Sequence, residues 1–281
     1  MRIIRTVKML RTALAAQRRR GRRIGLVPTM GALHEGHLSL IALAKRTADY
    51  VVVSIFVNPT QFGPEEDFAK YPRDLRGDAK KCLRAGVDLI FAPQVKEVYT
   101  EGFSTYITVE QLTQGLCGAH RPGHFRGVAT VVGKLFNMVQ PDVAVFGQKD
   151  AQQAAVIKRM VRDLNFPIEI AIGPIVREPD GLALSSRNAY LSPEERRQAP
   201  TLYQALKLAK ELAASGEKRP AVVKREMLRL IRRKSPLAKV EYIEFVDQEN
   251  LKPVNELVKN KILVALAARF PSARLIDNIT V

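Results

Sequence analysis

The chain has 281 residues, 46% of them hydrophobic, which is enough for one large domain or two modest ones with substantial cores. No apolar stretch approaches the ~18–20 residues that a membrane span requires, so we expect a soluble chain with no membrane partner. The formal net charge of +17 favours anionic partners such as nucleic acid or phosphorylated substrates. Cys82 and Cys117 are too few for a disulfide framework, which predicts a reducing, cytoplasmic location.

Short apolar runs rich in β-branched residues alternate with amphipathic segments in the first two thirds of the chain. The runs cover residues 24–27, 50–57, 87–91, 143–146 and 168–172. Valine and leucine recur at helical spacing between residues 128 and 139. The alternation predicts an α/β fold with a Rossmann-like, doubly wound parallel sheet over residues 1–175. Ligands of such sheets bind beyond the carboxyl ends of the strands.

The pattern changes near Ile175, and residues 176–281 are predicted to form a smaller C-terminal α+β domain. Ser192, Pro193 and Glu195 form a helix start with a capping box. Two basic amphipathic helices are expected at 195–214 and 219–233. Strands are expected at 240–246, 262–270 and 274–279.

Two clusters carry much of the positive charge. One contains five arginines between residues 18 and 23, and the other lies between residues 225 and 234. Neither has the interleaved aromatic residues of a surface that stacks single-stranded bases. We therefore interpret both as solvated helix faces and expect no specific nucleic-acid partner, although nonspecific binding at low salt would follow from the charge.

The most informative segment is His34-Glu35-Gly36-His37, which follows the apolar run that ends at Pro28. Gly31 allows a tight turn, and apolar residues then continue at helical spacing. The two imidazoles are therefore expected at a strand-to-helix junction. Free backbone N–H groups and the positive end of the helix dipole attract phosphate at such a junction. A chance His-x-x-His pair on a surface helix is the alternative.

This segment resembles the HxGH signature of the nucleotidylyltransferase superfamily. Three further segments restrict the resemblance to one family. They are Phe-Val-Asn-Pro-Thr-Gln-Phe at 56–62, Phe-Gly-Gln-Lys-Asp-Ala-Gln-Gln at 146–153, and Val-Arg-Glu-Pro-Asp-Gly-Leu-Ala-Leu-Ser-Ser-Arg-Asn at 176–188. In this order and spacing the four segments resemble the pantothenate synthetase (pantoate–β-alanine ligase) family over nearly the whole chain.

The resemblance implies an AMP-forming ligase of pantothenate and coenzyme A biosynthesis. In such an enzyme (R)-pantoate, β-alanine and ATP give pantothenate, AMP and pyrophosphate through an enzyme-held pantoyl adenylate. It also implies Mg²⁺ bound with the ATP, a homodimer, and closure of residues 176–281 over the nucleotide. Two rival interpretations are a nucleotidylyltransferase that keeps the nucleotide in its product and a basic nucleic-acid-binding protein without ATP chemistry.

The resemblance also implies the residues that bind ATP. It places His34 and His37 at the α-phosphate, with Lys149 as a third catalytic residue on the phosphates. The other ATP-binding residues that it implies are Met30, Gly31, Gly147, Asp150, Val176, Leu184, Ser185, Ser186 and Arg187. By themselves a loop lysine or a Ser-Ser-Arg tripeptide would be ordinary solvated features.

Pantoate and β-alanine are expected to contact Gln61, Gln153, Asn58 and His124. For Asn58 the alternative is that it only caps the turn at Pro59, which is frequent for asparagine before proline. We expect His124 to precede the helix at 128–139.

Two groups of residues could be taken for metal sites. Cys117, His120 and His124 resemble a partial zinc site, but no fourth ligand is apparent in the sequence. Asp78 matches an acidic position of the family and is a candidate metal ligand, with a solvated aspartate on a helix surface as the alternative.

Overall fold

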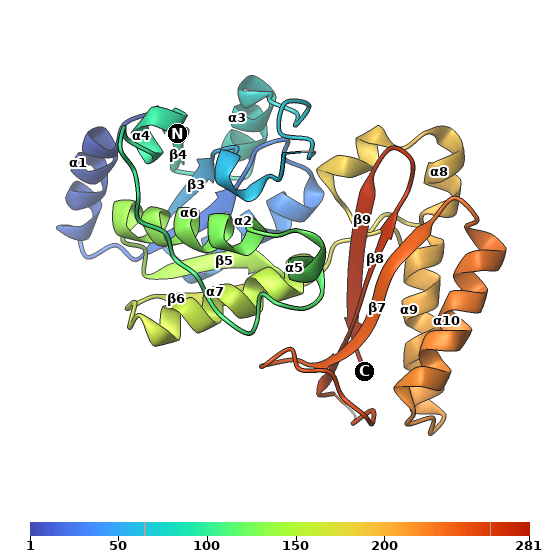
Figure 1. Ribbon diagram of the computed structural model, residues 1–281. Helices are drawn as coiled ribbons and strands as arrows, with labels where there is room; N and C mark the ends of the chain where they lie inside the picture. The colour runs from blue at the N-terminus through green and yellow to red at the C-terminus, as the bar shows by residue number, and fades with distance from the viewer. Residues whose placement is uncertain (65, 259) are drawn as a thin grey trace. The chain divides into compact units, whose positions relative to one another are not determined.

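The computed structural model describes residues 1–64, 66–258 and 260–281, and it divides into two compact units (Figure 1). The first unit consists of Met1–Glu110, Arg121–Gln148 and Val156–Pro174. The second consists of Gln111–His120, Lys149–Ala155 and Ile175–Val281. Within the described ranges, no helix combines the length and the apolar character needed to cross a membrane.

The first unit is built on a six-stranded parallel sheet. Its strands are β1 (Arg2–Ile4), β2 (Ile24–Thr29), β3 (Tyr50–Ile55), β4 (Leu89–Phe91), β5 (Val143–Gly147) and β6 (Glu169–Gly173). Their order is β1-β4-β3-β2-β5-β6, and every pair is parallel. The predicted doubly wound α/β sheet is therefore confirmed, with β1 as an additional short edge strand.

The strand order reverses between β2 and β5. From β2 the chain proceeds through β3 to β4 on one side, whereas β5 and β6 lie on the other. The register of β2 with β3 runs from Ile24 to Thr29, but its register with β5 covers only Gly25 and Leu26. This reversal is the place where open α/β sheets bind ligands, beyond the carboxyl ends of the strands.

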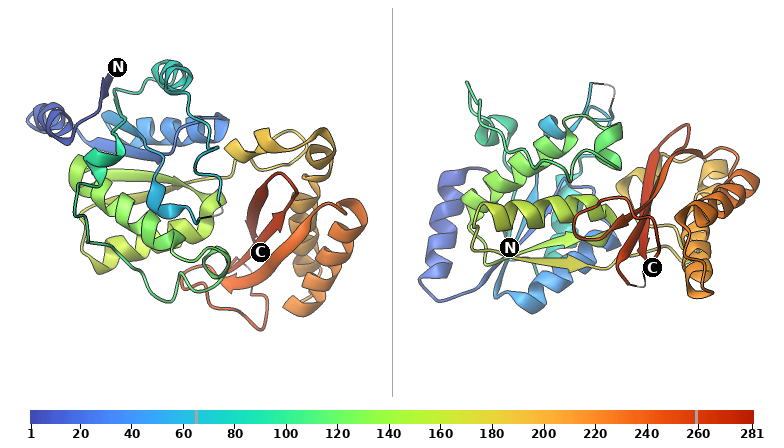
Figure 2. Two further views of the ribbon diagram at one scale, coloured as in Figure 1. Left: turned by 45° about the horizontal axis from the view of Figure 1, so that its top comes forward. Right: turned by 60° about the horizontal axis from the view of Figure 1, so that its bottom comes forward.

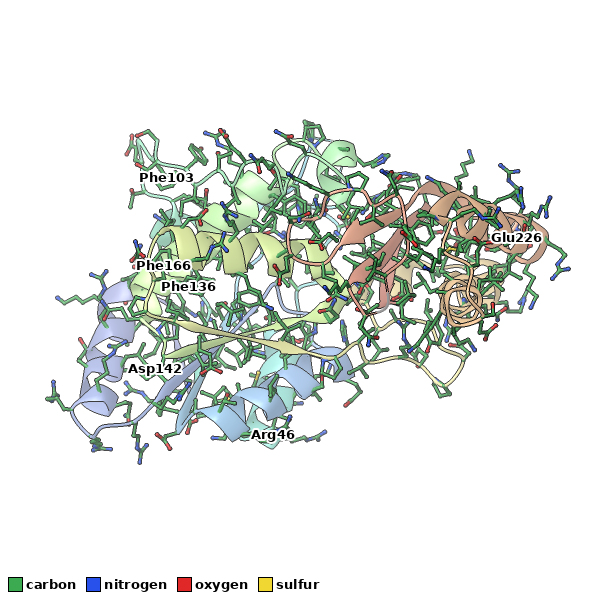
Figure 3. All side chains as sticks on the ribbon, turned by 90° about the horizontal axis from the view of Figure 1, so that it is seen from below. Arg46, Phe103, Phe136, Asp142, Phe166 and Glu226 are labelled. Carbon is green, nitrogen blue, oxygen red and sulfur yellow. The ribbon has the colours of Figure 1, made fainter. Side chains whose placement is uncertain are left out.

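Helices cover both faces of this sheet. They are α1 (Val7–Arg18), α2 (Glu35–Thr47), α3 (Leu75–Arg84), α4 (Val95–Val98), α6 (His124–Val139) and α7 (Ala151–Asp163), whose first five residues belong to the second unit. Figure 3 shows α2, with Arg46, on one face and Phe136 of α6 with Phe166 on the other. The rings of Phe136 and Phe166 pack edge to face, with centroids 5.5 Å apart. Ile41 of α2 packs with Val27 and Val53 in a fully buried cluster.

The second unit contains a three-stranded antiparallel sheet. Its strands are β7 (Lys239–Asp247), β8 (Ile262–Arg269) and β9 (Arg274–Thr280), and its helices are α5 (Cys117–His120), α8 (Pro193–Gln198), α9 (Thr201–Ala214) and α10 (Pro220–Lys234). Helices α9 and α10 cover one face of this sheet (Figure 2). Leu206 of α9, Met227 of α10 and Val264 of β8 are buried in the core between them.

One expected helix proves to be two. The single helix predicted for 195–214 is wrong, because α8 ends at Gln198 and α9 begins at Thr201. Pro200 lies at the break and has no N–H with which to continue the helical hydrogen bonds. The capping box is confirmed: Ser192 Oγ accepts the N–H of Glu195, and the Glu195 carboxylate accepts the N–H of Ser192.

Candidate functional site

The turn between β2 and α2 has an unusual backbone. Gly31 has φ +87° and Ala32 has φ +52°, so two consecutive residues are left-handed. The left-handed φ of Gly31 favours glycine, and a Cβ atom there would lie 3.0 Å from an oxygen of Asp78 and 3.1 Å from Ile55, so these side chains would have to shift slightly. This turn brings His34 to the N-cap of α2.

His34 and His37 form a reciprocal cap at the start of α2. Nδ1 of His34 accepts the N–H of Gly36 at 3.2 Å, and Nδ1 of His37 accepts the N–H of His34 at 3.3 Å. A nitrogen that accepts a hydrogen bond carries no proton, so the neutral rings carry their hydrogen on Nε2. The ring centroids are 4.1 Å apart. The pair can therefore donate two neighbouring hydrogen bonds to one anionic group.

Protein groups occupy the backbone amides of this junction. Asp78 accepts the N–H groups of Ala32 and Leu33, at 2.9 and 2.8 Å. The imidazoles accept those of His34 and Gly36. The expectation that free amides here attract phosphate is therefore wrong for these four groups. The histidine pair at this junction can still offer hydrogen bonds to an anion.

Asp78 is buried, not solvated. It lies on α3 with 2% of its surface exposed, so the alternative of a helix-surface aspartate is wrong. Burial raises the pKa of its carboxyl, and the two backbone N–H bonds and the charge of Lys81 oppose that rise. Lys81 also donates to the carbonyl oxygen of Leu33. Both oxygens of Asp78 are thus committed to the turn before His34.

Asn58 has a structural role in the segment that follows β3. It is 1% exposed and caps the short helix η1 (Pro59–Gln61), where its Oδ1 accepts the N–H of Thr60 at 3.4 Å. Tyr99 donates its hydroxyl to the same oxygen at 2.8 Å. Nδ2 of Asn58 donates to Gln61 Oε1 at 3.2 Å and to the Gly127 carbonyl at 3.1 Å. Asn58 therefore caps the turn and also holds the side chain of Gln61, and its contact with pantoate stays a prediction.

A chain of polar side chains supports the backbone of Gln61. His124 approaches the Gln61 carbonyl through Nδ1 at 2.8 Å, and Arg121 lies 3.0 Å from Nε2 of His124. Arginine can only donate, so Nε2 accepts and Nδ1–H donates to Gln61. Arg121 also binds Glu66 with two nitrogens. His124 is the first residue of α6, so the expectation that it precedes the helix is wrong.

Gln61 also contacts the segment that leads to the histidines. Its Nε2 donates to Sδ of Met30 at 3.0 Å. Met30 directly follows β2, so this contact brings together residues that follow two neighbouring strands. The first unit thereby assembles the predicted residues Met30, His34, His37 and Gln61 at the carboxyl ends of β2 and β3.

In the second unit, Lys149 and Asp150 belong to the short helix η2 (Gln148–Asp150) that leads into α7. Nζ of Lys149 lies 3.9 Å from an Asp150 oxygen. Asn278 of β9 donates through Nδ2 to the carbonyl oxygen of Lys149 at 2.9 Å. Gln153 lies half-buried in the first turn of α7. The backbone of Lys149 is thus fixed by the C-terminal strand.

The block at 176–188 folds back on itself. Leu184 donates its N–H to the carbonyl of Val176 at 3.0 Å, beside an antiparallel bridge between Arg177 and Ala183. Ser185 then caps η3 (Ser186–Tyr190) by accepting the N–H of Arg187 at 3.3 Å. The predicted Ser185, Ser186 and Arg187 therefore occupy an ordered loop and the first turn of a helix.

Arg177 anchors this block. Its guanidinium binds Asp277 of β9 in a bidentate ion pair, with N–O distances of 2.6 and 2.9 Å, and stacks on the ring of Tyr203 at 3.7 Å from the centroid. Burial raises the pKa of Asp277, and the Arg177 contact opposes that rise. Two adjacent residues of β9, Asp277 and Asn278, therefore hold the block at 176–188 and the backbone of Lys149.

Comparisons with known proteins identify the family. Residues 2–280 match the pantoate-beta-alanine ligase family. The chain belongs to this family. It is 58% identical over 279 residues to pantothenate synthetase of Moorella thermoacetica, covering 99% of this chain and 98% of that protein. It is 55% identical to that of Acetivibrio thermocellus, covering 100% and 99%.

Solved structures agree with this family membership. Pantothenate synthetase from Thermus thermophilus has a TM-score of 0.94 at 51% identity, covering 100% of this chain and 99% of that one. The pantoate-beta-alanine ligase from Francisella tularensis, solved with beta-gamma ATP and beta-alanine, has a TM-score of 0.83 at 34% identity, covering 100% and 97%. This member of the pantoate–β-alanine ligase family is accordingly a ligase of pantothenate biosynthesis, and the predicted resemblance is confirmed.

The zinc-like pattern has another explanation in this ligase. Cys117 Sγ lies 3.1 Å from the Tyr242 hydroxyl, and both terminal nitrogens of Arg274 lie 3.6 Å away. The ring of His120 packs against that of Tyr242 with centroids 5.5 Å apart. Among the described residues no group of three or more His, Cys, Asp or Glu side chains is arranged to hold a metal ion.

Sequence reasoning missed several residues that support the ligase site. Arg121, Asp277 and Asn278 attracted no prediction, and Asp78 was considered only as a metal ligand or a surface residue. A signal existed for two of them, since Asp277 and Asn278 stand between the apolar pair Leu275–Ile276 and Ile279 of the terminal strand. Buried polar residues in such a strand need partners, and here the partners are Arg177 and Lys149.

Proposed function

We propose that this chain condenses (R)-pantoate with β-alanine in two steps that use ATP. In the first, a pantoate carboxylate oxygen attacks the α-phosphorus of ATP. The bond from that phosphorus to the bridging oxygen of the β-phosphate breaks, and pyrophosphate leaves. In the second step the β-alanine amine attacks the acyl carbon of pantoyl adenylate. AMP departs, the amine loses a proton to solvent, and the amide of pantothenate remains.

The histidine pair carries this proposal. Because the Nδ1 atoms of His34 and His37 accept backbone N–H groups, their Nε2 atoms carry the hydrogen and can donate it to the α-phosphate in a hydrogen bond. Negative charge accumulates on that phosphate in the transition state, and preorganised donors stabilise it without having to reorganise. The ring spacing of 4.1 Å suits two donors to one phosphate group.

The remaining residues bind and orient the substrates. We assign the polyphosphate to Lys149, Ser185, Ser186 and Arg187, because ammonium, hydroxyl and guanidinium groups are suitable donors to phosphate oxygens. We assign pantoate to Gln61 and Gln153, whose amides offer both donors and acceptors. Asn58 and His124 act by holding Gln61. The wider nucleotide contacts are assigned to Met30, Gly31, Gly147, Asp150, Val176 and Leu184.

No protein nucleophile is required by this mechanism. Phosphoryl and acyl transfer through an adenylate depend mainly on positioning and on charge stabilisation. Mg²⁺ is proposed to enter as part of the ATP substrate, because this ion usually takes most of its ligands from phosphates and water. Asp78 does not fit a dedicated protein ligand, since both its oxygens already bind backbone N–H groups in a buried position.

An isotope-exchange assay tests the order of the two steps. With ATP, Mg²⁺ and pantoate but no β-alanine, the enzyme should exchange labelled pyrophosphate into ATP. When β-alanine is added, AMP and amide should form in equal amounts. ADP as product would indicate an acyl phosphate and contradict the proposal. AMP formed without an amide would favour a nucleotidylyltransferase.

Three further parts of the proposal concern the location, the assembly and the partners of the protein. We propose a cytoplasmic homodimer without a specific nucleic-acid partner. Sedimentation equilibrium should then give about twice the chain mass of 31.4 kDa. A mass equal to one chain across micromolar concentrations would contradict the dimer.

A further inference from the structure

We propose that Asp78 and Lys81 of α3 are positioning residues for the catalytic histidines, and that Asp78 is not a Mg²⁺ ligand. The inference rests on the proposed role of His34 and His37 in adenylation. Asp78 binds the two backbone N–H groups that precede His34, and Lys81 binds the carbonyl oxygen of Leu33. Helix α3 therefore holds both polar backbone groups of the residue next to His34.

The turn needs such support because its backbone is strained. Ala32 has φ +52°, a left-handed conformation that is unfavourable for a residue with a Cβ atom. Strain of this kind persists only where the surroundings fix it. The carboxylate of Asp78 supplies two charge-assisted hydrogen bonds to this turn from a buried position, where such bonds are strong.

The contacts of α3 affect the positions of the two imidazoles because Leu33 directly precedes His34 in the chain. Leu33 is 2% exposed and is fixed by its side chain in the core as well as by α3. His34 follows it directly, and the N–H of His34 in turn holds Nδ1 of His37. A shift of the Ala32–Leu33 backbone would therefore move both imidazoles relative to a bound phosphate.

A metal role for Asp78 disagrees with these contacts. A magnesium ligand needs an oxygen that faces the ion, and it usually shares the ion with water and phosphate. Each oxygen of Asp78 instead faces a backbone N–H, in a side chain from which water is almost excluded. Among the described residues no cluster of carboxylates or other ligands accompanies it.

The test compares Asp78→Asn with Asp74→Asn on the same helix. Asparagine can accept only one of the two N–H groups at position 78, because its NH₂ group is a donor. Asp74 caps α3 by accepting the N–H of Gly77 instead of an N–H of the turn, so it is a matched control for loss of a helix carboxylate. Lys81→Met is a milder second variant, which removes the bond to Leu33 and the positive charge near Asp78 but leaves the two hydrogen bonds of Asp78 in place.

We expect Asp78→Asn to lower kcat of pantoate-dependent pyrophosphate exchange about 10- to 100-fold, as a displacement near 1 Å does in catalytic sites. Lys81→Met should lower it less, and Asp74→Asn should leave it near wild type after correction for folded protein. The Mg²⁺ concentration at half-maximal exchange should be unchanged in all three. Added to the double variant His34→Ala/His37→Ala, Asp78→Asn should reduce the rate little further, because the change at Asp78 acts through these two side chains.

Imidazole NMR gives a readout that needs neither substrate nor Mg²⁺. The chain has only four histidines, so each ring can be assigned. Asp78→Asn should shift the His34 and His37 ring signals and leave those of His120 and His124 in place, and Asp74→Asn should shift none. Unshifted rings in folded Asp78→Asn, a normal exchange rate, or a raised Mg²⁺ requirement would each overturn the inference. Absence of exchange in the wild-type protein would instead contradict the proposed function.

Discussion

Asn278 donates its side-chain amide to the carbonyl oxygen of Lys149 at 2.9 Å, across a separation of 129 residues in the sequence. The neighbouring Asp277 binds Arg177, which anchors the block that carries Ser185 and Arg187. Two successive residues of β9 thus support both predicted phosphate-binding segments of the second unit. A fixed backbone at a lysine helps to position its ammonium group for binding a phosphate.

Replacing Asn278 tests this relationship. Asn278→Ala should raise the KM for ATP and lower kcat of the adenylation step, together about 10-fold in kcat/KM, because the Lys149 backbone loses its anchor. The free energy of unfolding should fall by about 1 kcal/mol for the lost hydrogen bond. Steady-state kinetics and urea unfolding measure the two effects. The control Asn255→Ala, at an exposed position, should change neither, and wild-type kinetics in Asn278→Ala would refute the link to Lys149.

Removing one side chain that donates a hydrogen bond to phosphate should lower the catalytic rate while the protein still folds. His37→Ala and Lys149→Ala should each reduce kcat by ~10²–10³, the usual cost of removing one preorganised donor. Neither side chain belongs to the buried core, so both variants should fold, and His37→Ala should lose about 1 kcal/mol of unfolding free energy with the hydrogen bond from the His34 N–H. His120→Ala, an exposed histidine against Tyr242, serves as the matched control. Normal turnover in folded His37→Ala or Lys149→Ala would remove that residue from the mechanism.

The stability of the second unit should depend on the ionisation of Glu195. Burial alone would raise the pKa of this carboxyl, but hydrogen bonds from Ser192 and Ser272 lower it from 4.5 to about 2. Because the folded pKa is the lower one, the stabilisation is complete above about pH 4.5 and is lost as the pH falls towards 2. Glu195→Gln should therefore be less stable than wild type at neutral pH.

The measurement is urea unfolding at several pH values. Between pH 4.5 and 2 the free energy of unfolding should fall less steeply in Glu195→Gln than in the wild type. Glu194→Gln, an exposed neighbour, should follow the wild-type curve. Parallel curves for wild type and Glu195→Gln would show that Glu195 does not carry this dependence.

The basic clusters should bind nucleic acid only through charge. Arg18 already donates to the carbonyl oxygens of Val139 and Gln140, and Arg225 and Arg229 pair with Glu226. Any affinity for DNA or RNA should therefore fall steeply with salt and show no sequence preference. Fluorescence anisotropy at 50 and 200 mM salt tests this. Tight binding of one particular sequence at physiological salt would revive the interpretation as a nucleic-acid-binding protein.

The features that depend on neighbours along the chain were predictable from the amino-acid sequence. Apolar runs alternating with helical periodicity predicted the doubly wound sheet, and the Ser192–Glu195 spacing predicted a capping box that the structure contains. The His34–His37 segment was correctly expected at the junction of a strand and a helix. These features are local, because turns, caps and periodicity need only residues a few positions apart.

The partners of the polar backbone groups at that junction became clear only from the folded structure. Asp78 reaches Ala32 and Leu33 across 46 and 45 residues, so it occupies amides that the sequence suggested were free for phosphate. Asn278 likewise reaches the carbonyl oxygen of Lys149 across 129 residues. Such hydrogen bonds depend on how segments distant in the sequence pack together. Helical or strand periodicity does not show which distant residues will come into contact. For this reason the position of His34 and His37 at the junction was predictable, whereas the residues that hold them in place were not.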